Sequence, residues 1–233
     1  MNPLDSTSDQ GYGQTSGDIP GHTSGHTSSH ASGQNWVTYY QAVEGRPPRE
    51  TLLKALANFD AEPSKPRLAV DLGCGDGRDT VELLRQGWRV LAIDGEPKAF
   101  ERLLSRPDLQ QAQLQTQLQT QLMRFEALSL PADVDLINAS FCLTFCPPAQ
   151  FPALWQTITS ALKPGGRFCG HLFGDRDSWT IYPNRTHHSR SQVEALLQPF
   201  QVEWLEEEEH PGVTAIGEQK HWHIYHIVAQ KRD

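Results

Sequence analysis

Large apolar side chains are almost absent from the first 34 residues and recur regularly after them. Residues 1–34 are instead rich in Ser, Thr, Gly, His, Asp and Gln. Such a segment cannot bury enough apolar surface to offset the entropy lost on ordering, so we expect a disordered, low-complexity tail over 1–34. Residues 35–233 are expected to form one folded domain, which begins with an aromatic and amphipathic stretch at 36–59.

Short apolar runs bounded by turn residues alternate with amphipathic stretches along this domain. The apolar runs predict strands, and the amphipathic stretches predict helices. We expect strands at 68–70, 88–93, 122–128, 135–140, 167–173, 202–209 and 221–229, where the acidic end of the sixth strand, 206–209, is expected to be solvated. We expect helices at 79–86, 96–106, 148–162 and after a capping box of Ser191 and Glu194. The near low-complexity stretch 110–121 favours a helix with a thin apolar stripe. The last two strands follow each other without a helix, which implies an antiparallel hairpin.

The stretch 67–80 reads RLAVDLGCGDGRDT and predicts a strand, a glycine turn and a helix. Gly73, Gly75 and Gly77 occupy alternate positions, and glycine both adopts positive φ and allows a ligand to approach the backbone closely. A dinucleotide site requires G-x-G-x-x-G, whereas here the third glycine comes one residue early and Arg78 follows it. The turn therefore argues against a nicotinamide dinucleotide.

Carboxylates surround this turn. Asp71 and Asp76 flank it, so a phosphate would meet like charge and a cationic ligand would meet opposite charge. Asp94 comes 23 residues after Asp71, at the end of the next predicted strand. An acidic residue at that place accepts hydrogen bonds from ribose hydroxyls. The alternative is that Asp94 only caps the helix that begins near Pro97.

The motif D-x-G-x-G-x-G, the later aspartate and a K-P-G-G turn at 163–166 resemble the class I S-adenosylmethionine-dependent methyltransferases. The resemblance covers 36–233, and DLGCGDGRDT with the closing stretch 217–231 is similar to the tellurite-resistance subgroup. The resemblance implies an α/β fold: a doubly wound, mostly parallel seven-stranded sheet with helices on both faces and one antiparallel strand near the C-terminus. It also implies S-adenosyl-L-methionine as cofactor, whose sulfonium and ammonium groups are cationic.

The resemblance also assigns roles to individual residues. Those expected around the cofactor are Asp71, Gly73, Gly75 and Gly77 for its methionine and ribose part, Asp94 for the ribose hydroxyls, Glu126 and Ala127 for the adenine, Asn138 and Ser140 by the reacting methyl group, and either Arg78 or Arg46 for the carboxylate. Those expected around the substrate are Tyr39, Tyr40, Arg46 and Phe141. The alternative for the aromatic side chains among them is that they pack on the sheet.

Methyl transfer is an in-line displacement at an activated carbon, so positioning can supply most of the rate enhancement. A nitrogen or oxygen nucleophile can also need a base. The candidates are His171, Asp175, His187, His188, His221 and His223, and the sequence singles out none of them. The catalytic residues are therefore left open.

Two sets of residues raise the question of a metal. His221 and His223 share one face of the last predicted strand, but no third ligand has a recognisable spacing, so we expect no metal site. Cys142 and Cys146 could bind a soft metalloid as thiolates, and the simpler interpretation is that they are buried thiols.

The composition of the chain limits the classes of partner and the location that we expect. The formal net charge is −8, which argues against nucleic acid or an anionic membrane. No stretch approaches the roughly 20 apolar residues of a membrane span, and no basic start precedes an apolar run, so we expect neither a span nor a signal peptide. The four cysteines form no C-x-x-C pair and indicate reduced thiols in a cytoplasmic protein. The oligomeric state is left open.

These observations predict an enzyme that transfers a methyl group from S-adenosylmethionine to a small-molecule or metalloid acceptor. One alternative is a module that binds the same cofactor without catalysis, or that transfers another part of it. A nicotinamide-dependent oxidoreductase is a further alternative, which the glycine spacing disfavours.

Overall fold

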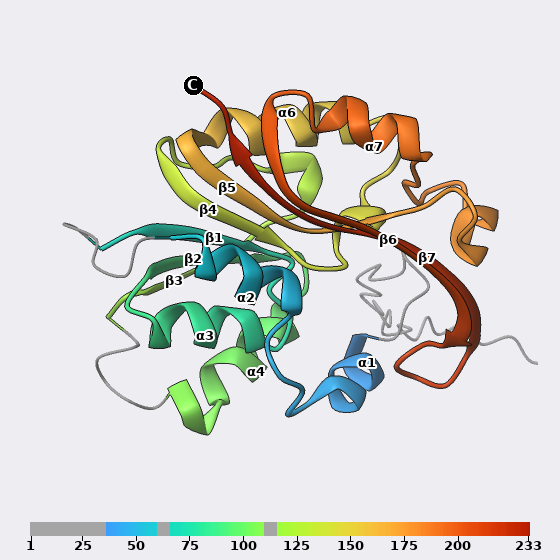
Figure 1. The fold of residues 1–233 in the computed structure, drawn as a ribbon. Helices are drawn as coiled ribbons and strands as arrows, with labels where there is room; N and C mark the ends of the chain where they lie inside the picture. The colour runs from blue at the N-terminus through green and yellow to red at the C-terminus, as the bar shows by residue number, and fades with distance from the viewer. Residues whose placement is uncertain (1–35, 60–65, 110–115) are drawn as a thin grey trace, which may run out of the picture. The chain divides into compact units, whose positions relative to one another are not determined.

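The computed structural model describes residues 36–59, 66–109 and 116–233. The predicted tail, 1–34, lies outside them. The described residues form one mixed sheet with helices on both faces (Figure 1). None of the described helices is long and apolar enough to cross a membrane.

The sheet has seven strands in the order β3-β2-β1-β4-β5-β7-β6. The strands are β1 (Leu68–Leu72), β2 (Arg89–Asp94), β3 (Leu118–Leu122), β4 (Val134–Ala139), β5 (Leu162–Phe173), β6 (Phe200–Val213) and β7 (Gln219–Lys231). The pairs from β3 to β5 are parallel, and β7 runs antiparallel to both β5 and β6. The strand order switches direction at β1, with β2 and β3 on one side of it and β4 and β5 on the other. In sheets of this kind ligands bind beyond the carboxyl ends of the strands at that point. The predicted fold class is confirmed.

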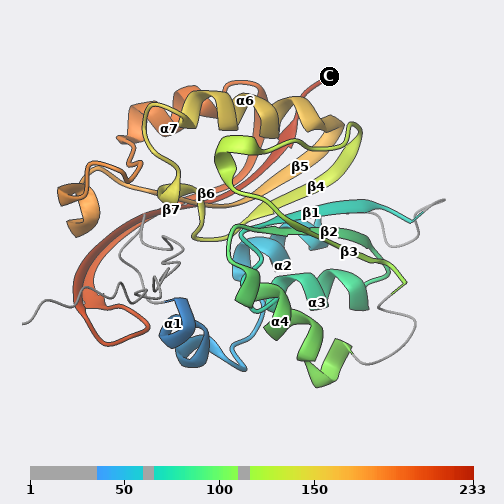
Figure 2. The same cartoon turned by 180° about the vertical axis from the view of Figure 1, so that it is seen from behind.

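Helices cover the two faces of the sheet in two groups (Figures 1 and 2). The helices are α1 (Trp36–Val43), α2 (Glu50–Ala57), α3 (Arg78–Arg85), α4 (Pro97–Ser105), α6 (Phe151–Ala161) and α7 (Arg190–Leu196), with short 3-10 turns η1 (Pro107–Leu109), η2 (Phe125–Ala127), η3 (Leu143–Phe145) and η4 (Ser178–Ile181). One core cluster joins α6 to Val70 and Leu72 of β1, and the other joins α2, α3 and α4 to Ala69. Successive residues of β1 therefore feed opposite cores, as the period of a buried strand requires.

The third strand differs from its prediction. It spans Leu118–Leu122 rather than 122–128, and the 3-10 turn η2 follows it. The predicted helix over 110–121 is therefore wrong for its last part, and 110–115 lies outside the described residues. The reason is backbone pairing, because Leu118 to Leu122 pair in register with β2 at the sheet edge, where exposed polar side chains are tolerated.

The capping box of α7 is also displaced by two residues. The Ser189 hydroxyl accepts a hydrogen bond from the Gln192 backbone nitrogen at 3.3 Å, and the Ser189 nitrogen donates to the Gln192 side chain at 2.8 Å. The predicted pair of Ser191 and Glu194 is therefore wrong, and α7 begins one residue after Ser189.

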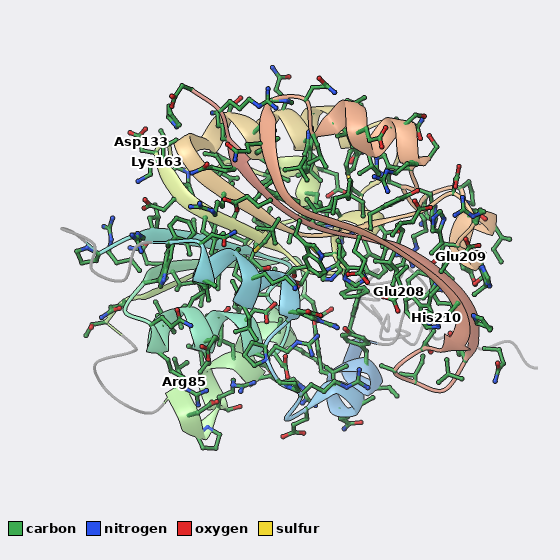
Figure 3. All side chains as sticks on the ribbon, in the orientation of Figure 1. Arg85, Asp133, Lys163, Glu208, Glu209 and His210 are labelled. Carbon is green, nitrogen blue, oxygen red and sulfur yellow. The ribbon has the colours of Figure 1, made fainter. Side chains whose placement is uncertain are left out.

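The predicted C-terminal hairpin is present but longer than expected. The acidic run 206–209 lies inside β6, where the side chains of Glu207, Glu208 and Glu209 pair with histidines on β7. Glu207 and Glu209 also pair with Arg176, in the loop after β5. Figure 3 shows Glu208, Glu209 and His210 on this hairpin, at the opposite side of the view from Lys163 near the start of β5.

Candidate active site

The glycine turn at 73–77 joins β1 to α3. Gly73, Gly75 and Gly77 have φ values of +63°, +57° and +81°, which side chains rarely tolerate. A Cβ atom at Gly73 would clash with Cys142, and one at Gly77 would clash with Leu103. A Cβ atom at Gly75 would meet only the Tyr40 ring, at 3.4 Å. Close packing thus explains why Gly73 and Gly77 have no side chain. Gly75 is the glycine of this turn beside which a ligand has room.

Asp94, the last residue of β2, braces this turn. Its Oδ2 atom accepts a hydrogen bond from the Gly75 nitrogen at 2.9 Å, and its Oδ1 atom accepts one from the Glu96 nitrogen at 2.9 Å. Burial raises the pKa of Asp94. The N-cap of α4 is Glu96, whose own carboxylate accepts from the Lys98 nitrogen. Asp94 is therefore not the helix cap, and its carboxylate, with about four lone-pair sites, keeps room for another donor.

A buried polar network lies directly beneath the turn. Asp71 accepts hydrogen bonds from the Thr80 hydroxyl at 2.6 Å and from the Asn138 amide at 2.9 Å. The same amide nitrogen donates to Asp79 at 3.1 Å. Burial and the neighbouring carboxylate of Asp79 raise the pKa of Asp71 to about 7. The network ties β1, β4 and the start of α3 together. Asp71 and Asn138 thus lie beside the glycine turn, and both side chains are buried.

Phe141 lies just beyond β4, in an unusual conformation. The Ser140 hydroxyl before it donates to the side-chain Oδ1 atom of Asn138 at 3.1 Å, so this segment continues the buried network. Phe141 has a φ of +56°, and its ring stacks on His171 with 3.9 Å between centroids. The Arg49 guanidinium lies 4.3 Å from the centroid of the same ring.

His171 is buried beneath that stack. Burial lowers its pKa well below the ordinary value, so the imidazole is neutral near pH 7. Among the described residues, its Nδ1 atom has no hydrogen-bond partner. Arg49 was not expected at the site. Burial and the charge of Arg78 lower its pKa to about 10, and its buried Nε atom also lacks a partner within the described part of the chain.

Helix α1 brings aromatic side chains to the turn. Tyr40 is buried against Gly75, and burial together with the charge of Asp94 raises its pKa. Trp36 packs edge-on against Phe145 of η3, with 5.0 Å between centroids. Tyr39 is partly exposed and packs against Trp36. Tyr40 thus lies against the glycine turn and also packs in the core, and Trp36 and Tyr39 pack on Tyr40.

The remaining predicted residues lie farther out. Arg46 is exposed, and Arg78 is partly exposed at the first position of α3. Glu126 and Ala127 are exposed on η2, where Glu126 pairs with Arg124 at 3.6 Å. Their segment runs beside β2, because the Met123 nitrogen donates to the Asp94 carbonyl at 2.9 Å.

The structure separates the six candidate bases. His221 hydrogen-bonds to Glu209 of β6, and His223 hydrogen-bonds to Glu207. Asp175 is exposed and lies near His223, and His188 packs on Phe151. His171 instead lies under Phe141, next to the buried network. His187 has a pKa lowered by burial. Across the described residues, no three His, Cys, Asp or Glu side chains are placed to hold a metal ion.

Residues 69–166 match the family model of a methyltransferase domain. A carboxy-S-adenosyl-L-methionine synthase of Pseudomonas putida (strain W619) is 32% identical over 170 residues, which are 70% of this chain and 63% of that protein. An uncharacterized methyltransferase of Synechocystis is 30% identical over 128 residues, 55% of this chain and 56% of that protein. The chain thus spans between about half and three fifths of the length of these curated relatives.

Solved structures share the fold at lower identity. TehB from Haemophilus influenzae superposes with a TM-score of 0.64 at 15% identity, covering 79% of this chain and 62% of that one. The 1,6-didemethyltoxoflavin-N1-methyltransferase of Burkholderia thailandensis, crystallised with 1,6-didemethyltoxoflavin and S-adenosylhomocysteine, gives 0.57 at 22% identity, covering 84% of this chain and 85% of that one.

Proposed function

The chain belongs to the class I S-adenosylmethionine-dependent methyltransferases, and we propose that it transfers a methyl group from S-adenosylmethionine to a small-molecule acceptor. One observation carries the proposal: Asp94 at the end of β2 holds the Gly75 nitrogen of the turn after β1. This places a carboxylate and an open glycine together beyond the carboxyl ends of two neighbouring strands, where ligands bind in sheets of this order.

The residues at the turn fit this cofactor. Gly75 offers backbone that a side chain would cover, and the free lone pairs of Asp94 suit ribose hydroxyls. The carboxylates of Asp71 and Asp94 favour a ligand that carries sulfonium and ammonium charges. Arg78 and the neighbouring Arg49 are the cations that we assign to the cofactor's own carboxylate.

When bound, S-adenosylmethionine would supply an activated methyl group. A lone pair of the acceptor forms the new bond to the methyl carbon, the electron pair of the broken methyl–sulfur bond stays on sulfur, and the acceptor's proton passes to solvent. The chain's part is to align the acceptor with that carbon. Ser140 and Phe141 follow β4, which pairs with β1, the strand that precedes the turn, so they are the residues we assign to that alignment. Glu126 and Ala127 are assigned to the adenine.

A second candidate function is transfer of a different group to or from the same cofactor. Its support is that several relatives, such as that of Pseudomonas putida, are carboxy-S-adenosyl-L-methionine synthases. The arginines near the turn are compatible with an additional carboxylate there. For partners, the net charge of −8 supports a small molecule rather than nucleic acid or membrane. The four free cysteines support a reducing, cytoplasmic location.

Calorimetry tests the proposal with S-adenosylmethionine, S-adenosylhomocysteine and NAD. We expect both adenosyl compounds to bind with a Kd on the order of 1–10 µM or weaker, as for a small ligand held by a few hydrogen bonds, and NAD to bind more weakly. Tighter binding of NAD would overturn the assignment. Mass spectrometry separates the two candidates when S-adenosylmethionine is incubated with the protein and a small-molecule cell extract that supplies the methyl acceptor or the carboxyl donor, because demethylation and carboxylation change the mass of the adenosyl compound in opposite directions.

A further inference from the structure

A continuous group of aromatic side chains lies beyond the carboxyl ends of β4 and β5. We call it the ring set: Trp36, Phe141, Phe145, Phe173, Trp179 and Trp222. Neighbouring rings lie 5.0–6.5 Å apart between centroids, from Trp36 to Phe145, on to Trp179 and then to Trp222. All members except Phe173 are partly exposed, so ring surface remains open to a ligand.

The ring set adjoins the turn that we assign to the cofactor. Phe141 directly follows Ser140, whose hydroxyl bonds to Asn138, and Asn138 in turn bonds to Asp71 of β1. Trp36 belongs to α1, which also carries Tyr40 against Gly75. An acceptor on these rings would therefore lie next to the position of the methyl group.

Cationic side chains of the protein lie over the faces of several rings of the ring set. The Lys220 nitrogen lies 4.0 Å from the Trp179 centroid and 4.5 Å from that of Trp222, and it pairs with the buried carboxylate of Asp177. The Arg185 guanidinium lies 4.1 Å over Phe145. A cationic acceptor would compete with these charges and be repelled by them, whereas a neutral or anionic one would not.

Phe141 shows that this part of the molecule is held in an uncommon arrangement. A bulky residue with positive φ is an outlier, and such outliers concentrate at ligand sites. The buried Nδ1 of His171 and the buried Nε of Arg49, on the two neighbours of its ring, lack partners among the described residues. Unsatisfied buried polar atoms beside a strained aromatic residue point to a ligand with polar groups.

The cysteines argue against a metalloid acceptor at the same place. Cys142 is buried, and its thiol donates to the Leu72 carbonyl at 3.1 Å. Burial raises the pKa of Cys142 and raises that of Cys146 to about 11. Both are therefore thiols near pH 7, and a soft metalloid binds thiolate.

We propose that the acceptor is a planar aromatic molecule without positive charge, which stacks on the ring set. The proposal rests on the methyltransferase function given above and names its substrate class. The transfer step is the one already described, with the methyl carbon joined to a nitrogen or oxygen of the planar molecule.

Binding of four probes tests it, measured by calorimetry on the full chain with S-adenosylhomocysteine present at saturation. The probes are 2-naphthoate, 2-naphthol, 2-naphthylmethylammonium and cyclohexanecarboxylate. We expect the first two to bind about tenfold or more tightly than the last two, since only they combine a flat ring with the absence of positive charge. Equal binding of cyclohexanecarboxylate, or tightest binding of the ammonium probe, would overturn the proposal.

A pair of matched variants locates the probe. Phe145→Leu should weaken 2-naphthoate binding about three- to tenfold through loss of one ring contact. Phe59→Leu is the control, because Phe59 is also partly exposed with an arginine over its ring, at 4.4 Å, but it packs on Trp88 before β2. Equal effects of the two changes would contradict the ring set as the site. Binding of S-adenosylhomocysteine alone is measured first on every protein. If the wild type fails to bind it, the methyltransferase proposal itself falls, whereas normal binding with the wrong probe order overturns only the acceptor class.

Discussion

The carboxylate of Asp94 accepts a hydrogen bond from the backbone nitrogen of Gly75, with 2.9 Å between Oδ2 and nitrogen. The end of β2 thereby fixes the middle of the turn that follows β1. A single carboxylate is thus assigned both to the shape of the turn and to the ribose, so its removal should affect stability and affinity together.

Asp94→Ala should leave a folded protein that binds S-adenosylhomocysteine about ten- to a hundredfold more weakly. A hydrogen bond to a charged group contributes roughly 1.5–3 kcal/mol, and the loosened turn adds to the loss. Calorimetry gives the affinity, and thermal denaturation should show a lower Tm.

Asp135→Ala is the matched control for this change. Asp135 also accepts a hydrogen bond from a backbone nitrogen at β1, that of Leu68 at 2.8 Å, but at the amino end of the strand. It should lower the Tm and leave the affinity unchanged. If Asp94→Ala behaves like this control, Asp94 has a structural role only.

The pKa of Asp71, raised to about 7, predicts a pH-dependent stability. A carboxyl with a raised pKa holds its proton more tightly in the folded than in the unfolded protein. Its contribution is therefore fully present below the unfolded pKa, near 4, and is lost as the pH rises to about 7. Urea denaturation of wild type and Asp71→Asn should show the variant gaining stability relative to wild type from pH 5 to pH 8. A difference that stays constant over this range would mean that Asp71 titrates normally.

Deletion of residues 1–34 should change the Tm by less than about 2 °C. The composition of the segment predicts that it adds no packing to the domain. Differential scanning calorimetry of the full chain and of the chain from residue 35 measures this. A decrease of many degrees would show that the segment docks on the domain.

The strand, glycine turn and helix at 67–85 can be predicted from the sequence because each has a local signal. The edge strand β3 cannot, since its alternating Leu, Gln and Thr residues carry little apolar signal and pairing with the distant β2 defines it. The cap of α7 is ambiguous for another reason: Ser189 and Ser191 are each followed three residues later by a Gln or Glu, and only the structure selects Ser189.

Much of the ring set is also beyond sequence reasoning. Phe145, Trp179 and Trp222 come from three separate parts of the chain, and the antiparallel pairing of β5 with β7 brings the last two together. Trp179 lies on η4, in the segment that follows β5, and the position of a tryptophan in a loop after a strand is a signal that could have suggested it. Arg49 has no such signal, because its position over Phe141 depends on how the segment before α2 crosses the sheet end.

The glycines of the turn lead to the last prediction, because they differ in what surrounds them. Gly77→Ala places a Cβ atom against Leu103 at a φ of +81°, so it should destabilise the protein by roughly 1–3 kcal/mol or more. In Gly75→Ala the new Cβ atom meets Tyr40 only at ordinary contact distance. The loss in free energy of unfolding should therefore be smaller, about 1–2 kcal/mol, and come from the positive φ alone.

The affinities should follow the opposite order. The new methyl group at Gly75 enters the space that we assign to the cofactor, so Gly75→Ala should weaken S-adenosylhomocysteine binding more than Gly77→Ala does. A double-mutant cycle separates the causes: Gly77→Ala should cost less in a Leu103→Ala background, where the clash is absent, while Gly75→Ala should cost the same in both. Urea denaturation and calorimetry on the single and double variants measure both quantities. If Gly75→Ala retains full affinity, the backbone at Gly75 does not contact the cofactor, and the turn's role is to shape the strand end alone.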